Sequence, residues 1–444
     1  MLLEIVSSAL FGGVALYAHL RQSGVSNDSE KLNKIFSLTG LNVRDKDKTY
    51  TAQLVKKVNH NWGAEYRYRI PLGRSFEDYQ AKLPHIQDGL NNRKTAMQFT
   101  WADIMALDRA RPLIPQIKEL LQKKKSAQKE VELSYDGLLK VKVYNRPLPA
   151  LVRYEDVPAS GSWSVPVGQI REGNTIIQHD FEQIPHMVVG GATRYGKSNF
   201  LNLVITTLLE QQAGNVLFTL IDLKGGVEFS EYRGIRQVAH YAEDPEEAEK
   251  ALQAIVEGMR GKQFALKQKG VRSVQEARES IRHFIIIDEV GELNPGEAVT
   301  KEERALKERC QTYMSQIARL GAGLGYRQIL ATQYPTGDVI PRQCKQNSDA
   351  KLCFRVQTAT ASRVVLDETG AETLPEIRGR AIYQTADKRQ IVQTPFIEPQ
   401  TIQRIVKPHI VIKPRKEQND AGHNQQSRTA GANPPQPGQI RFFE

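Results

Sequence analysis

One stretch of the chain has the residue types and spacing of a phosphate-binding loop. An apolar run from His186 to Gly190 leads into the sequence G-x-x-x-x-G-K-S, and a helix is expected to begin near Asn199. The glycines let successive backbone N–H groups turn towards phosphate oxygens, and the start of the helix adds its positive dipole end. This pattern predicts a Walker A loop whose nucleotide-binding residues are Gly191, Ala192, Thr193, Arg194, Tyr195, Gly196, Lys197 and Ser198.

A second motif supplies two carboxylates at the end of an apolar run. Phe284 to Ile287 is followed directly by Asp288 and Glu289, which is the pattern of a buried parallel strand that ends at a ligand-binding edge. We expect Asp288 and the Ser198 hydroxyl to hold Mg²⁺, and Lys197 to bridge the β- and γ-phosphates of ATP. Glu289 is expected to orient the attacking water. ATP and Mg²⁺ are therefore the predicted cofactors.

Two further strands are expected beside these motifs. The run Gln328 to Thr332 is followed by Gln333, which we predict to be the polar sensor of the γ-phosphate. The run Val216 to Asp222 leads into a glycine turn that contains Lys224. The sequence is compatible with two roles for Asp222 and Lys224, a structural role or a contact with a neighbouring subunit.

The arrangement of the expected elements indicates an α/β fold with a mainly parallel sheet. Between residues 161 and 408, apolar strand-like runs alternate with amphipathic helical stretches, as in parallel sheets covered by helices. Residues 23–160 instead predict a small α+β module, with a hairpin at 50–58 and 64–70, a helix at 75–90 and a strand at 138–144. At least two domains are expected for a chain of 444 residues.

The two ends of the chain differ from its centre. Residues 5–20 carry no formal charge, so residues 1–22 are a candidate membrane helix, with a terminal helix packed on protein as the alternative. Basic residues follow this segment, so a membrane anchor would leave the rest of the protein at the cytoplasmic face. Residues 409–444 are rich in Gln, Asn, Gly and Pro and predict a disordered tail.

Charge and cysteine content limit the classes of partner and site. The formal net charge of +11 favours phosphate-rich partners or anionic membrane surfaces and does not choose between them. The three cysteines lack C-x-x-C spacing and have no histidine cluster beside them, so no zinc site is predicted.

Together these stretches resemble the motor domain of the FtsK/SpoIIIE family of DNA translocases. The resemblance covers about residues 165–395 and rests on four stretches: the Walker A loop, 221–228, the strand and carboxylates at 283–289, which form the Walker B motif, and 319–335. It extends through 362–381. It implies a RecA-like fold, ATP-driven movement along double-stranded DNA, and a ring of six subunits with active sites between neighbours. It also implies that Arg319 and Arg363 are candidates for an arginine that acts on the ATP of the adjacent subunit.

The chain also departs from the chromosome-partitioning members of that family. It has at most one candidate membrane helix, and after Val406 it has only the predicted tail. Arg194 and Tyr195 stand where many relatives have small residues. This layout is similar to the FtsK-like coupling proteins of Gram-positive conjugative elements, which implies a relaxase and a transfer channel as partners. A plasmid or phage partitioning or packaging ATPase, and a secretion ATPase that moves protein, remain the alternatives.

Overall fold

The computed structural model describes residues 28–91, 128–159, 161–173, 175–333, 337 and 339–411. The predicted membrane helix at 1–22 and almost all of the predicted tail at 409–444 lie outside these residues. No helix within the described residues is long and apolar enough to cross a membrane.

The large sheet contains ten strands within the described residues. They are β7 (Ser164–Gln169), β8 (Ile176–Asp180), β9 (Met187–Gly190), β10 (Val216–Asp222), β11 (Val238–Ala242), β12 (Arg282–Asp288), β13 (Tyr326–Thr332), β14 (Ala350–Phe354), β15 (Arg380–Gln384) and β16 (Arg389–Gln393). Their order is β11-β10-β12-β13-β9-β14-β15-β16-β7-β8. The strands from β11 to β14 run parallel, and the remaining pairs are antiparallel. This confirms the predicted α/β class with a mainly parallel sheet.

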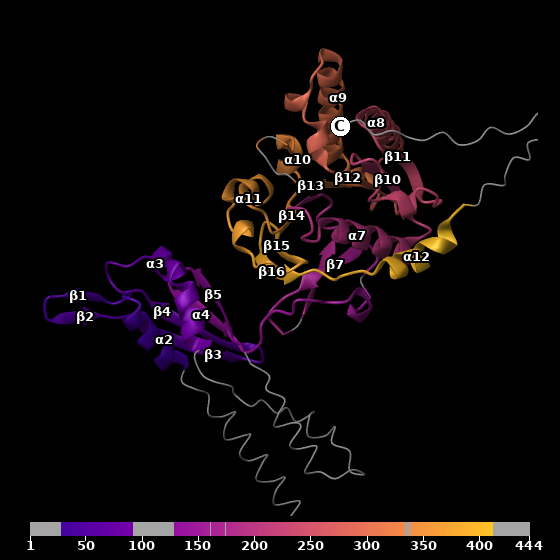
Figure 1. Ribbon diagram of the computed structural model, residues 1–444. Coiled ribbons are helices and arrows are strands. Elements are labelled where there is room, and N and C mark those ends of the chain that lie inside the picture. The colour runs from indigo at the N-terminus through magenta and orange to yellow at the C-terminus, as the bar shows by residue number, and fades with distance from the viewer. Residues whose placement is uncertain are drawn as a thin grey trace, which may run out of the picture. The chain divides into compact units, whose positions relative to one another are not determined.

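Helices cover both faces of this sheet (Figure 1). They are α7 (Lys197–Gln212), α8 (Pro245–Gln268), α9 (Lys301–Leu320), α10 (Arg342–Gln346), α11 (Ala359–Leu366) and α12 (Pro399–Val406). Phe284 and Ile286 of β12 pack into a core with α7 and α12. Ile285 and Ile287 point to the opposite core, which includes α8, α9 and α11. The central strands are continuously apolar because both of their faces are buried.

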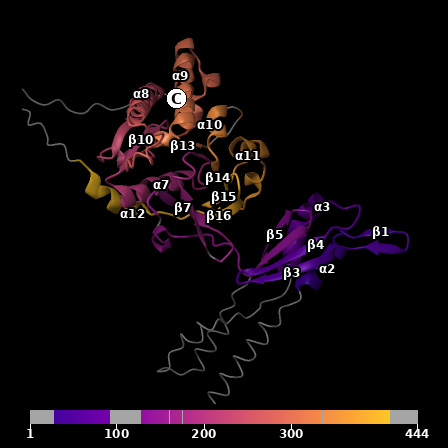
Figure 2. The ribbon, with the colours of Figure 1, turned by 180° about the vertical axis from the view of Figure 1, so that it is seen from behind.

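A separate four-stranded antiparallel sheet precedes the large one (Figure 2). Its strands are β3 (Gln53–His60), β4 (Gly63–Arg69), β5 (Glu130–Tyr135) and β6 (Leu139–Tyr144), in the order β3-β4-β6-β5. The same part of the chain contains the helices α2 (Asp28–Leu38), α3 (Phe76–Ala81) and α4 (Leu83–Asn91), and a two-stranded hairpin of β1 (Val43–Asp45) and β2 (Lys48–Tyr50). Phe36 of α2 packs edge-on against Tyr68 and Tyr79, with ring centroids 5.4 and 5.1 Å apart. The strands β3, β4 and β6 match the predicted hairpin and strand.

The predicted single helix at 75–90 is two helices in the structure. The first ends at Ala81 and the second begins at Leu83. Pro84 follows directly, and it has no N–H to continue the hydrogen-bond ladder of the first helix. A proline is tolerated in the first turn of a helix, so a new helix starts there.

The turn between β8 and β9 is tied to the amino-terminal edge of the large sheet by a buried ion cluster. Glu182 accepts hydrogen bonds from Arg282 at 2.7 and 2.9 Å and from Arg327 at 2.7 Å. Both arginine side chains are almost fully buried, at 5% and 1% exposure. Burial alone would raise the pKa of Glu182, but the hydrogen bond from Arg282 and the charges of Arg327 and Arg282 outweigh it and lower the pKa to about 2.

Replacing Glu182 by Ala is therefore expected to lower the free energy of unfolding by about 3 to 5 kcal/mol, since two buried arginines lose their counter-charge. Because the folded-state pKa is depressed, the stabilisation is present above the unfolded pKa of about 4.3 and is lost as the pH falls towards 2. Urea unfolding at several pH values measures both effects.

The matched control is Glu279→Ala. Glu279 has a similar exposure, 28% against 25%, but it pairs with the lysines Lys262 and Lys269. Its loss should cost about 1 kcal/mol or less. Equal losses for the two variants would contradict the structural importance of the Glu182 cluster.

Candidate functional site

The predicted Walker A loop lies between the carboxyl end of β9 and the first turn of α7. Its backbone is held by neighbouring strands: Ala192 N–H donates to Arg355 O at 2.9 Å, and Tyr195 O accepts from Gly379 N–H at 2.8 Å. Gly196 has a φ of 122°, and a Cβ there would lie 3.1 Å from a ring carbon of Phe354. A residue with a side chain would be strained at this position.

The Walker A lysine and the first Walker B carboxylate form a buried ion pair. Lys197 Nζ donates to Asp288 Oδ1, and both side chains are inaccessible to solvent or nearly so. Burial raises the pKa of Asp288, although the charge of Lys197 opposes this shift. The pair brings together the two groups that the sequence assigned to phosphate and to Mg²⁺.

The residues at this position fit a magnesium ion. Asp288 Oδ2 is buried and makes no hydrogen bond with the described residues, so an anionic oxygen is left with free lone pairs. Ser198 follows Lys197 on the first turn of α7 and adds a hydroxyl oxygen. Mg²⁺ is usually bound in proteins through one or two carboxylates together with phosphate oxygens and water.

The second Walker B carboxylate is held just beyond the end of β12. Glu289 has a left-handed backbone, with φ 63° and ψ 64°. Its Oε1 accepts from the Thr332 hydroxyl at 2.8 Å, and its Oε2 accepts from the Gln333 N–H at 3.0 Å. A non-glycine residue in this backbone region is uncommon, and such residues cluster at functional sites.

The predicted sensor lies against the Walker A loop. The Thr193 hydroxyl donates to Gln333 Oε1 at 3.1 Å. Gln333 therefore contacts the loop through its side chain and Glu289 through its backbone N–H. The structure thus brings Thr193, Gln333 and Glu289 together, as well as Lys197 and Asp288.

Residues at the end of β10 complete the site, and the sequence patterns did not assign them a role there. Asp222 is buried and accepts backbone N–H groups of Lys224, Glu228 and Phe229, so it shapes the glycine turn. Lys224 Nζ lies 3.0 Å from Glu289 Oε2. Lys224 and Glu289 meet because Asp222 and Asp288 are paired residues of adjacent strands. The sequence carried no signal for this contact, since it does not show which strands become neighbours.

The two candidate arginines lie in different places. Arg319 is exposed in the last turn of α9, seven residues before β13 begins, and therefore at the amino-terminal edge of that strand. Arg363 is exposed on α11, which packs against β9: a Cβ on Gly190 would lie 2.3 Å from Val365 Cγ2. In the described part of the chain, neither guanidinium makes a recorded hydrogen bond or ion pair with the Walker residues.

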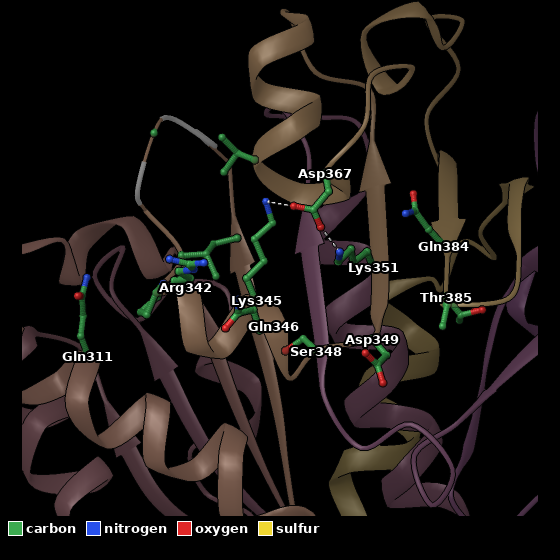
Figure 3. A pocket seen from close by; sticks show the side chains of 15 residues that line it. Gln311, Arg342, Lys345, Gln346, Ser348, Asp349, Lys351, Asp367, Gln384 and Thr385 are labelled. Atoms are coloured by element: carbon green, nitrogen blue, oxygen red, sulfur yellow. Dashed lines mark hydrogen bonds and ion pairs between the residues drawn. The ribbon is translucent and has the colours of Figure 1, made fainter.

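A cavity of about 820 Å³ lies between α10, the end of α11 and the end of β15. Figure 3 shows Lys345 and Lys351 pointing towards Asp367. Lys345 Nζ lies 2.6 Å from Asp367 and also donates to the Arg363 carbonyl at 3.0 Å, and Lys351 forms an ion pair with Asp367. Arg342 also lines the cavity and is exposed. These contacts fix the end of the helix that carries Arg363.

Residues 155–320 match the model of the FtsK/SpoIIIE family. The chain is 31% identical over 261 residues to DNA translocase FtsK of Streptococcus pyogenes, a match that covers 54% of this chain and 31% of that protein. The chain thus spans less than a third of the length of such relatives.

Two solved structures share the fold. The pCW3 conjugation coupling protein TcpA, in its monomer form with ATPγS, has a TM-score of 0.57 at 22% identity, over 86% of this chain and 99% of TcpA. ATPases 2 and 3 of EssC from Geobacillus thermodenitrificans have a TM-score of 0.50 at 18% identity, over 59% of this chain and 51% of that one. These likenesses confirm the RecA-like P-loop ATPase fold.

Variants of the two Walker motifs should separate binding from hydrolysis. Lys197→Ala is expected to lose ATP binding, because the phosphates lose their cation and Asp288 is left buried without a counter-charge. Glu289→Gln should bind ATP as the wild type does and hydrolyse it about 10² to 10⁴ times more slowly. Binding of a fluorescent ATP analogue and release of phosphate measure the two steps.

The control is Glu279→Gln, the same substitution at a residue that follows α8 and pairs with Lys262 of that helix. It should leave both steps unchanged. Failure of Glu289→Gln to bind nucleotide would reassign Glu289 to the metal shell or to the fold. Wild-type turnover by Lys197→Ala would refute the Walker A assignment.

Proposed function

We propose that the protein hydrolyses ATP and uses the energy to move DNA, a proposal that the match of residues 155–320 to the FtsK/SpoIIIE family model supports. The observation that carries the proposal is the arrangement of Lys197, Asp288 and Glu289. A phosphate-binding lysine, an ion-binding carboxylate and a fixed second carboxylate meet at the carboxyl edge of one parallel sheet. This is the edge at which open α/β sheets bind ligands.

The proposed reaction is the attack of water on the γ-phosphorus of ATP. Lys197 and the loop N–H groups neutralise the phosphate oxygens, and Glu289 orients the water and accepts its proton as the new P–O bond forms. The bond from the γ-phosphorus to the β–γ bridging oxygen breaks, and ADP leaves. A bound Mg²⁺ would neutralise charge on the β- and γ-phosphates. Gln333 contacts both the Walker A loop and Glu289. A movement of the loop on nucleotide binding would therefore be passed to Glu289 through Gln333.

DNA is the proposed substrate for movement. The relatives that match over about half of this chain are DNA translocases by name, and the net charge of +11 suits a polyanionic partner. Movement of protein by a secretion ATPase is the alternative from another class of motor.

The finer proposal is a coupling protein of a conjugative element, which delivers DNA to a transfer channel. The fold likeness to TcpA extends over 86% of this chain, well beyond residues 155–320, and TcpA is a conjugation coupling protein. A relaxase and channel proteins are then the expected partners, at the cytoplasmic face of the membrane. A partitioning or packaging ATPase is the alternative within DNA motors.

DNA should stimulate hydrolysis by the wild-type protein several-fold at low salt, and the stimulation should fall steeply with rising salt as phosphate contacts are screened. Phosphate release is measured with double-stranded DNA, with single-stranded DNA, with heparin and without polyanion. Heparin controls for charge alone. A rate unchanged by either form of DNA, or raised equally by heparin, would contradict a DNA motor.

Activity is further proposed to be shared between subunits of a hexamer. The candidate arginines are exposed, and an arginine acting on a neighbour's ATP contributes about 10³ to 10⁵ in rate in related systems. Mixing Lys197→Ala subunits with Arg363→Ala subunits should therefore restore part of the activity. The restored fraction should rise with protein concentration, because assembly obeys mass action.

The control is the same mixture made with Arg319→Ala in place of Arg363→Ala. Variants that assemble together and yet stay inactive at every ratio would exclude Arg363. Restoration in the control mixture would then assign the role to Arg319.

A further inference from the structure

Glu289 is held from both sides by the strands that flank β12. On one side, the Thr332 hydroxyl and the Gln333 N–H come from the end of β13. On the other side, Lys224 comes from the turn after β10, with its Nζ 3.0 Å from Glu289 Oε2. Among these three contacts, Lys224 alone carries a charge.

The turn that carries Lys224 is itself fixed in place. Asp222 is buried, and its two carboxylate oxygens accept N–H groups at the start and the end of the turn: Lys224 at 3.2 Å, and Glu228 and Phe229 at 2.7 and 3.2 Å. The ammonium of Lys224 is therefore delivered to Glu289 by a rigid backbone. Its side chain is 29% exposed, whereas that of Glu289 is 4% exposed.

The charges at this edge of the sheet require such a cation. Three carboxylates lie together here, because Asp222 and Asp288 are paired residues of adjacent strands and Glu289 directly follows Asp288. Lys197 forms an ion pair with Asp288, and the carboxylate of Asp222 accepts hydrogen bonds from three backbone N–H groups. Without Lys224, the buried carboxylate of Glu289 would have neutral donors only, and a buried charge is costly unless it is paired.

We propose that Lys224 is a positioning residue for hydrolysis: its ammonium fixes the orientation of the Glu289 carboxylate, and it does not bind the nucleotide. The inference rests on the proposed function, in which Glu289 accepts the proton of the attacking water. A carboxylate offers about four lone-pair sites. Lys224, Thr332 and Gln333 occupy three of them, which leaves one site for water.

Lys224→Ala tests this in the full-length protein, with hydrolysis measured without DNA. The kcat is expected to fall roughly 10- to 100-fold, the range for losing one charged hydrogen bond, with KM for ATP unchanged. Lys224→Arg should recover part of the loss because it restores the cation. The control is Lys262→Ala, which removes a lysine of α8 with a similar exposure, 27%, from its ion pair with Glu279 and should leave kcat unchanged.

A double-mutant cycle separates positioning from a general structural effect. In single-turnover assays, Lys224→Ala should have little further effect in a Glu289→Gln background, because it acts through the Glu289 charge. In urea unfolding, Lys224→Ala should lower the midpoint more in the wild-type background than in the Glu289→Gln background, because only the wild type retains the buried charge.

Several outcomes would overturn the proposal: a kcat of Lys224→Ala within two-fold of wild type, an altered KM at constant kcat, or equal losses in both backgrounds. Because hydrolysis is read without DNA, a wild type that hydrolyses ATP but ignores DNA refutes the DNA motor and leaves this test intact. A wild type without any hydrolysis overturns both.

Discussion

The site depends on one constraint: the register of the parallel strands places their carboxyl ends side by side. Asp222 pairs with Asp288 across β10 and β12, and Thr332 pairs with Gly190 across β13 and β9. Hydrogen bonding fixes these registers along the whole length of each strand. A residue placed directly after any of the four strands therefore arrives at the same edge of the sheet. Segments separated by more than a hundred residues in the chain meet there without long loops.

This alignment concentrates charge inside a sheet that is otherwise apolar, and the structure balances that charge at both edges. At the carboxyl edge, Lys197 pairs with Asp288 and Lys224 with Glu289. At the amino-terminal edge, Glu182 neutralises Arg282, the first residue of β12, and Arg327, the second residue of β13. Buried ion pairs of this kind contribute little net stability, but the loss of one partner is costly. They hold the strands in one arrangement in which the reactive groups face each other.

The sequence predicted the parts of this molecule that depend on local pattern. The Walker loop, the Ile-rich strand before Asp288 and the hairpin around Asn59 all follow from spacing and side-chain type within a few residues. The contacts of Lys224 and Glu182 were not predictable, because they depend on which strands become neighbours, and strand order has no local signature. The break between Ala81 and Leu83 was missed because the apolar spacing continues through it, although Pro84 was visible. Arg363 and Arg319 could be proposed only by resemblance, since exposed arginines have no pattern of their own.

The backbone contacts of the Walker loop have a consequence for the order in which the protein folds. The loop at 191–198 is bonded to Arg355 and Gly379, and β9, which leads into it, lies between two strands that are synthesised more than a hundred residues later. Contacts between such distant residues form late, because a long loop must close first. During translation, the loop therefore cannot take its phosphate-binding shape until residues near 379 have left the ribosome. ATP can stabilise this protein only once most of its chain has been made, and it cannot guide the early steps of folding.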